Sequence, residues 1–135
     1  MITYSHRITF VTMRKPTQKN INEKLQWFGN SLGLFNLRDK DKSCYRIFIE
    51  LLKATKKSTP LSSDELAARL GLTRGTVIHH ISKLMDAGIV VHDNNRYLLR
   101  VDNLKALVAE LEKDVKRMTE DLKDIADEID KSLGL

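Results

Sequence analysis

Side chains that could contact a nucleic acid recur on one face of the helix that we expect over residues 73–87. Val77, Ile81 and Leu84 recur at helical spacing and form the inward face of this helix. The opposite face then carries mostly polar groups, namely Gly75, His79, Ser82 and Asp86, flanked by Thr76 and Lys83. Hydroxyl, imidazole and ammonium groups can bond phosphates and base edges. The pattern therefore predicts a DNA-binding surface.

Residue types that would support catalysis or metal binding are scarce. His79 and His80 are adjacent, so their side chains diverge by about 100° on a helix and do not readily chelate one ion. His80 is expected to be a half-buried flank residue. The single cysteine, Cys44, lies on an apolar stripe, which favours a small core side chain over a redox switch. With no phosphate loop or nucleophile–base motif in the sequence, we expect no enzyme, metal site or cofactor.

A short helix and a tight turn are expected to hold the helix over residues 73–87. Ser62 and Glu65 have the spacing of a capping box, in which each residue satisfies a backbone N–H of the other. Gly71 supplies the turn after the short helix, and Thr73 can cap the following helix. The short helix, the turn and the following helix together predict a helix-turn-helix.

A hairpin is expected to follow. Gly88 is placed to end the helix, and the segments 89–92 and 96–100 predict two strands. The Asp-Asn-Asn turn at 93–95 joins them, because these residues tolerate left-handed backbone. An apolar stripe also predicts a further helix that begins at Asp39 or Asp41. Helix, short helix, turn, helix and hairpin is the order of elements in a winged helix-turn-helix. The sequence therefore predicts this mainly helical α+β fold over residues 39–102.

Residues 1–38 are expected to form an extension made of a strand and a helix. Ile2, Tyr4, Ile8 and Phe10 alternate with polar residues, which predicts a half-buried strand. A basic linker over 14–19 follows, and a helix over 21–32 has Asn20 and Glu23 placed as an N-terminal capping pair and Gly33 as its stop.

Residues 103–135 predict one long helix that dimerises as a coiled coil. At about 1.5 Å per residue the helix is about 45 Å long, more than a small domain can cover. Its apolar side chains alternate spacings of four and three, which favours an intermolecular seam over packing on the same chain. The predicted seam residues are Leu104, Val108, Leu111, Val115, Met118, Leu122, Ile125 and Ile129. The flanking charges leave the orientation of the two helices open.

The run LSSDELAARLGLTRGTVIHHISKLMDAGIV, residues 61–90, resembles winged-helix transcriptional regulators of the ArsR (arsenical-resistance repressor) superfamily, especially an archaeal branch. The resemblance covers about residues 42–102, and the last helix is similar to the dimerisation helix of such proteins. Metal-sensing members use paired cysteines on the recognition helix, or His and Asp clusters on the last helix. Neither is found here, so the resemblance implies sequence-specific, dimeric transcription control without metal sensing.

The resemblance places further residues against DNA. Arg74 would bond a guanine edge or a phosphate, and Ile78 would meet a thymine methyl group. In the wing, Arg96 with its asparagine neighbours would reach the minor groove or its phosphates. The complete set of expected DNA-binding residues is Arg74, Gly75, Thr76, Ile78, His79, Ser82, Lys83, Asn94, Asn95 and Arg96.

Charge is distributed unevenly along the chain. The net charge of +5 divides into +8 over residues 1–60, zero over 61–102 and −3 over 103–135. The neutral middle segment argues mildly against strong phosphate binding, and Arg14, Lys15 and Lys19 would compensate if they lay on the same face. Because the N-terminus lacks a continuous apolar stretch and no apolar run is long enough to span a membrane, we expect a cytoplasmic protein.

Two functions remain open at this stage. The first is a homodimeric regulator of transcription, more plausibly a repressor, that binds double-stranded DNA at a palindromic operator. A small-molecule effector, bound near Trp27, would be a subtype of this function. The alternative is a winged-helix scaffold that binds proteins and has no specific affinity for DNA.

Overall fold

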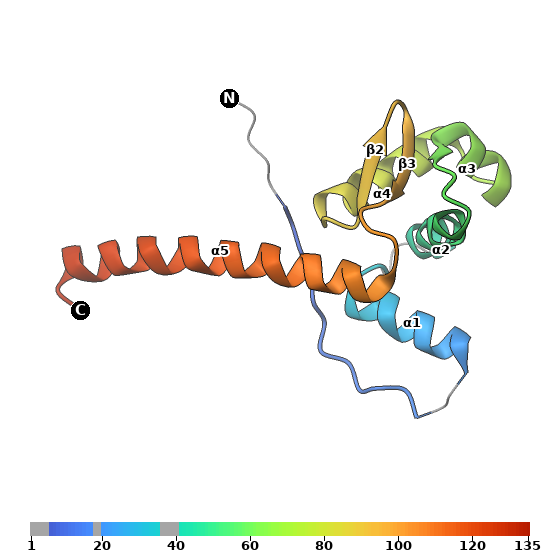
Figure 1. Ribbon diagram of the computed structural model, residues 1–135. Coiled ribbons are helices and arrows are strands. Elements are labelled where there is room, and N and C mark those ends of the chain that lie inside the picture. Colours follow the sequence, from blue (N-terminus) through green and yellow to red (C-terminus); the bar gives the residue numbers. More distant parts are fainter. Residues whose placement is uncertain (1–5, 18–19, 36–40) are drawn as a thin grey trace.

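The computed structural model of the chain describes residues 6–17, 20–35 and 41–135. Five helices and three strands are formed within these residues (Figure 1). In chain order they are α1 (Ile21–Ser31), α2 (Ser43–Lys56), β1 (Leu61–Ser62), α3 (Ser63–Leu70), α4 (Arg74–Asp86), β2 (Val90–Asp93), β3 (Arg96–Leu99) and α5 (Leu104–Leu133). The order confirms the mainly helical α+β winged helix-turn-helix and its long C-terminal helix. No described helix is long and apolar enough to cross a membrane.

A small antiparallel sheet joins the wing to the start of α3. Its strand order is β1-β3-β2, with Leu61 opposite Tyr97 in one pair and Val90 opposite Leu99 in the other. The two predicted strands of the hairpin are confirmed within a residue at each end. β1 is an additional strand that the sequence analysis missed, because two residues after Pro60 show no strand period of their own.

The core is built from α2, α3, α4, the sheet and the first turns of α5. The apolar stripe of α2 supplies the centre, with Ile47, Phe48 and Leu51 fully buried. Cys44 is buried at the edge of this cluster, as the stripe predicts. Helix α2 begins at Ser43, later than the expected start at residue 39 or 41. Residue 39 itself lies outside the described residues.

Helix α5 starts on the core and then leaves it. Asn103 caps the helix, accepting a hydrogen bond from the backbone N–H of Ala106 at 2.8 Å. Leu107 and Leu111 are fully buried against the core of the same chain. Beyond them α5 projects as a straight rod away from the other helices and the sheet (Figure 1). The seam predicted for dimerisation is therefore corrected at Leu111, which is already covered within one chain.

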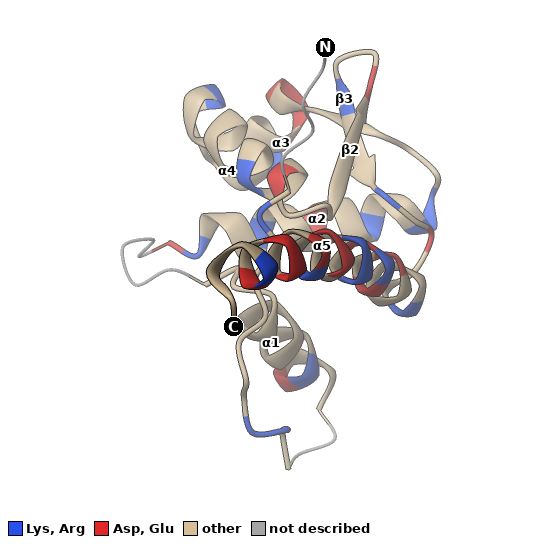
Figure 2. Cartoon of the chain, turned by 90° about the vertical axis from the view of Figure 1, so that its left-hand side faces the viewer, with Lys and Arg blue, Asp and Glu red and all other residues tan. Residues whose placement is uncertain are grey.

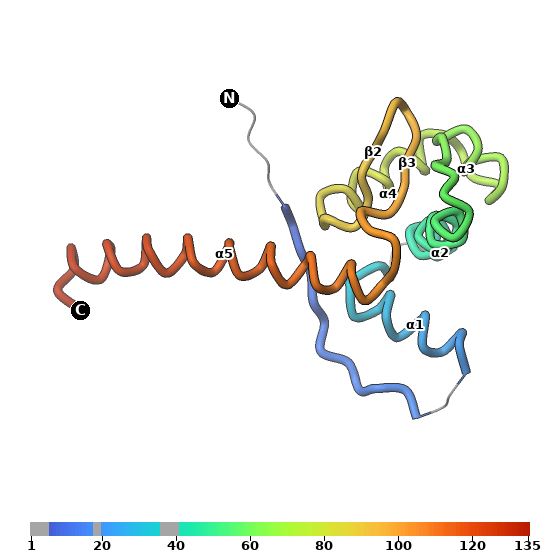
Figure 3. The backbone as a smooth tube through the Cα atoms, in the orientation of Figure 1, coloured from blue at the N-terminus to red at the C-terminus, as the bar shows by residue number. Residues whose placement is uncertain are grey.

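The N-terminal strand predicted over residues 2–10 is not formed in its described part, residues 6–10. Residues 6–10 are extended but pair with no strand, and residues 1–5 lie outside the described part of the chain. Instead the segment passes α5 and bonds two helix ends, with Arg7 N–H donating to the Asp86 carbonyl at 2.7 Å and Val11 N–H to the Ser31 carbonyl at 2.8 Å (Figure 3). Ile8 packs on the core while Phe10 is exposed, so the alternation does not define one buried face.

Helix α1 forms as predicted, capped by Asn20 and followed by Gly33 in a left-handed conformation. Gly29 is buried within it. A Cβ added at Gly29 would lie 2.9 Å from the ring of Tyr45 and 3.1 Å from that of Phe35. Gly29 thus lets α1 approach these two stacked aromatic rings.

Candidate nucleic-acid interface

Local capping interactions fix the turn between α3 and α4. The Ser62 hydroxyl accepts a hydrogen bond from the Glu65 N–H at 3.0 Å and donates to the Glu65 carboxylate at 3.2 Å. Gly71 ends α3 with φ +65°, and the Thr73 hydroxyl accepts from the Thr76 N–H at 3.1 Å. Ser62, Gly71 and Thr73 therefore act as expected, whereas the Glu65 carboxylate accepts from the Ser62 hydroxyl instead of the Ser62 backbone N–H. Together these contacts set where α4 begins relative to α3.

Helix α4 has one buried face and one open face. Val77, Ile81 and Leu84 are buried, as predicted from their spacing, and His80 is buried with them rather than half-buried. On the open face Thr76 is half-buried, and the other residues expected to face DNA are exposed: Arg74, Gly75, Ile78, His79, Ser82 and Lys83. A Cβ at Gly75 would meet no atom within 4 Å, so the helix surface there is open to close approach.

The wing stands beside α4 as a short exposed hairpin (Figure 1). Asn94 and Asn95 occupy the turn with φ values of +49° and +65°, and both are exposed. Two successive left-handed residues form the turn whose twist suits a two-residue hairpin. The wing tip thus presents two amide side chains, which can donate and accept hydrogen bonds.

Both arginines expected to meet DNA have acidic neighbours on α3. Arg74 Nε lies 3.7 Å from Asp64 Oδ1, and Arg96 Nη1 lies 2.7 Å from Glu65 Oε1 and 3.3 Å from the Pro60 carbonyl oxygen. These arginines are at least half exposed. Exposed ion pairs contribute only about 0–1 kcal/mol, so phosphates could replace the carboxylates at little cost. Arg96 also ties the wing to the capping box through Glu65.

The basic segment 11–17 does not add to this face. The segment 11–17, which carries Arg14 and Lys15, lies on the far side of α1 and α5 from α4 (Figures 1 and 2). Lys19 lies outside the described residues. Basic and acidic segments are mixed along α5, which is seen nearly end-on in Figure 2. Within one protomer, the positive charge available beside α4 therefore comes from residues of the winged domain and from exposed Arg7, whose backbone N–H bonds the Asp86 carbonyl at the end of α4.

The predicted seam on α5 divides into two parts. Leu104 and Val115 are half-buried on the chain's own domain, and Val108 lies at the edge of exposure. The remaining seam residues Met118, Leu122, Ile125 and Ile129 are exposed, and Leu133 extends the same row. The first part of this apolar row therefore packs on the chain's own core, and the part beyond Val115 is exposed.

An ion cluster at the root of α5 was missed by the sequence analysis. Asp114 is 3% exposed and receives two bonds from Arg100, with N–O distances of 2.5 and 3.2 Å, and a further one from Arg117. The hydrogen bond from Arg100 lowers the pKa of Asp114 below its ordinary value, although burial opposes this, and it raises the pKa of Arg100. One feature of the sequence could have indicated that Asp114 is buried: it follows Leu111 by three residues and so lies on the inward stripe of the helix.

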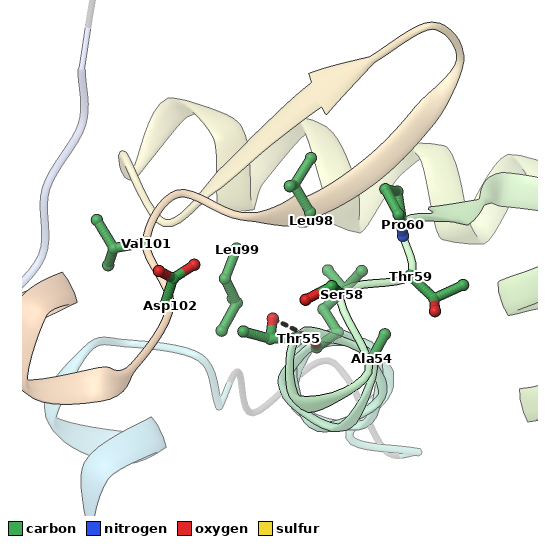
Figure 4. Close-up of a pocket in the computed structure, with 10 residues that line it drawn as sticks. Ala54, Thr55, Ser58, Thr59, Pro60, Leu98, Leu99, Val101 and Asp102 are labelled. Atoms are coloured by element: carbon green, nitrogen blue, oxygen red, sulfur yellow. Dashed lines mark hydrogen bonds between the residues drawn. The ribbon is translucent and has the colours of Figure 1, made fainter.

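A small cavity lies beside the wing rather than at α4 (Figure 4). Its volume is about 120 Å³, and it lies between the C-terminal half of α2 and the strand β3. Leu98, Leu99 and Val101 supply apolar walls, and the Thr55 hydroxyl donates to the Leu51 carbonyl at 2.8 Å. Asp102 is the one ionisable residue in the lining. Within the described residues, no group of three His, Cys, Asp or Glu side chains is placed to hold a metal ion.

Comparison with known proteins gives one match. Residues 49–91 match the family model described as bacterial regulatory protein, arsR family. The matched segment runs from α2 through α3, the Gly71 turn and α4 into β2. No curated protein and no solved structure matches the chain.

Proposed function

We propose, from the premise that residues 49–91 are an ArsR-family helix-turn-helix domain, that the protein is a sequence-specific DNA-binding regulator of transcription. It acts as a homodimer on a palindromic operator and represses transcription by occupying it. The observation that carries the proposal is the open outer face of α4, a helix held in place by caps at both ends of the preceding turn. The major groove of B-DNA is wide enough to admit such a helix.

Base readout is assigned to the exposed side chains of α4. Arg74 at the first turn reaches a guanine edge or a phosphate, and the hydroxyls of Thr76 and Ser82 bond phosphates or base edges. Gly75 permits close contact between the helix and the DNA backbone, and Ile78 packs on a thymine methyl group. His79 donates a hydrogen bond from the middle of the same face.

Phosphate contacts are assigned to the ends of this surface. Lys83 lies near the C-terminal end of α4, while Arg96, Asn94 and Asn95 lie in the wing. Arg96 exchanges Glu65 for a phosphate when DNA binds. Because few cations serve this surface, affinity depends on base contacts more than in strongly basic domains, and its salt dependence is moderate.

The homodimer is supported by the apolar side chains that remain exposed. Apart from Ile78 on α4 and Val91 in the wing, the large exposed apolar residues of the described chain lie on or just after α5, on the N-terminal segment and at the start of α1. A row of exposed apolar residues on a projecting helix is typical of an interaction surface. A second copy offers an identical row, so two α5 helices can bury theirs against each other.

Selection from a random pool of DNA duplexes tests the proposed function. The protein is expected to enrich a palindromic motif whose half-site centres lie about 10–10.5 base pairs apart, or a multiple of that, as two recognition helices on one face of B-DNA require. Footprinting on the enriched duplex should then protect both half-sites. Failure to enrich any motif would contradict the proposal.

The scaffold function stays as the second candidate because one observation favours it. The segment 61–102 has no net charge, and Ile78 and Val91 expose apolar surface on α4 and the wing. A face of this kind also suits a protein partner. A scaffold would bind DNA weakly and without sequence preference, so the same selection separates the two functions.

A further inference from the structure

Arg100 joins three elements at the root of α5. It follows β3 directly, and its Nη1 atom lies 3.4 Å from the Gly88 carbonyl oxygen, at the turn that ends α4. The same guanidinium bonds both oxygens of Asp114 on α5 and approaches the Glu110 carboxylate at 3.5 Å. The end of the recognition helix, the base of the wing and α5 are thus linked through one side chain.

The geometry of this junction is specific. A planar guanidinium that bonds both oxygens of one carboxylate fixes direction as well as distance. Gly88 allows the approach, since a Cβ there would lie 3.3 Å from both Arg100 Nη1 and Asp114 Oδ2 and 3.2 Å from His6 Nδ1. Turning α5 away would break both bonds between Arg100 and Asp114, so these bonds oppose such a turn while Asp114 stays charged.

A small change in the direction of α5 displaces the residues farther along the helix by a larger distance. Ile125 lies about 16 Å beyond Asp114 along the helix axis, at about 1.5 Å per residue. A tilt of about 10° at Asp114 therefore moves Ile125 by about 3 Å, which is close to the rise of about 3.4 Å per base pair in DNA. Small changes at the junction would change the separation of two recognition helices by about one base pair.

We propose that the Arg100–Asp114 pair is a positioning device that fixes α5 relative to α4 and so sets the half-site spacing that the dimer accepts. The proposal rests on the proposed function, because spacing has meaning only for a dimer on a two-part operator. Neither residue needs to touch DNA. Their effect is on which arrangement of half-sites both recognition helices can reach together.

Spacing tolerance provides the first test. Affinity is measured for the selected operator, for the same operator lengthened by about one base pair, which turns one half-site by about 35°, and for a single half-site. Two linked domains gain about 10²–10⁴-fold when both can engage, and this gain is lost when the geometry forbids it. We expect wild type to lose about 100-fold on the lengthened operator and Asp114→Asn to lose less than about 10-fold, with unchanged affinity for the single half-site.

Two further variants test whether the effect comes from the geometry of the Arg100–Asp114 pair or only from the charges on these residues. Arg100→Lys keeps the charge but not the two-pronged geometry, and it should relax spacing as Asp114→Asn does. Asp127→Asn removes an exposed carboxylate of the same helix, 3.0 Å from Lys131, and should behave as wild type. Unchanged spacing discrimination in both junction variants would overturn the proposal.

A readout without DNA distinguishes failure of this inference from failure of the proposed function. Spin labels are attached at exposed Ser82 in a Cys44→Ala background, and distances between the two labels of the dimer are measured. A narrow distribution in wild type that broadens in Asp114→Asn supports the positioning role, even if no operator is found. Equal widths would overturn the role, whatever the DNA experiments show.

Discussion

Replacing Leu122 and Ile125 of α5 by aspartate should convert the protein to a monomer with an intact winged domain. These side chains are 68% and 55% exposed in one chain, so pairing of two α5 helices has most of their surface left to bury. Complete burial of a Leu or Ile is worth about 1.5–3 kcal/mol, which gives about 1–2 kcal/mol for each exposed remainder. The four side chains of a dimer then contribute about 4–7 kcal/mol, and their loss raises the dimer Kd by about 10³–10⁵-fold.

Sedimentation equilibrium at micromolar concentration measures this change directly. The matched control is Lys116→Asp with Lys123→Asp, which places two carboxylates on the same helix away from the apolar row and should leave the dimer intact. Circular dichroism should show unchanged melting of the winged domain in both variants, because the core uses Leu107 and Leu111 instead. A wild-type monomer, or a double variant that remains dimeric, would refute the assignment of α5 as the dimer seam.

Three other changes test separate parts of the structure. Gly88→Ala should destabilise the fold by about 1–2 kcal/mol, because the φ of Gly88 is +77°. Gly75→Ala, in the open part of α4, should instead stabilise the fold by up to about 1 kcal/mol. Thermal unfolding measures both changes. Wild type should have a larger free energy of unfolding than Asp114→Asn at neutral pH. Because the pKa of Asp114 is lowered in the folded protein, this difference should disappear as acid protonates the carboxylate. Urea unfolding at several pH values measures it. Arg74→Ala should flatten preference at particular base pairs by about 1–3 kcal/mol, whereas Arg96→Ala should weaken all sequences alike and lower the salt slope by about one.

Local interactions explain why much of the winged domain could be predicted from the sequence. Ser62 caps α3 through a residue three positions away, Thr73 caps α4 in the same way, and Gly71 turns the chain between them. Such contacts depend on neighbours in sequence, so their spacing is visible without the fold. The exposed face of α4 follows from the same helical period.

Non-local contacts explain what could not be predicted. β1 exists because Leu61 and Ser62 pair with Tyr97 and Arg96, more than thirty residues later in the chain. The alternation of residues 2–10 resembles a strand, but the described part, 6–10, bonds helix ends instead. Leu111 and Leu122 occupy equivalent positions in the row on α5, and only tertiary packing makes one of them core and the other exposed.

Titration of the selected operator and a scrambled duplex at two salt concentrations tests the central claim most directly. The claim is that the exposed face of α4 reads a DNA sequence. The operator should bind at least about 10³-fold more tightly than the scrambled duplex near physiological salt. Raising the salt should weaken both while preserving most of that ratio, because phosphate contacts are common to both duplexes. Equal binding of the two duplexes at both salt concentrations would contradict the account and favour the scaffold function.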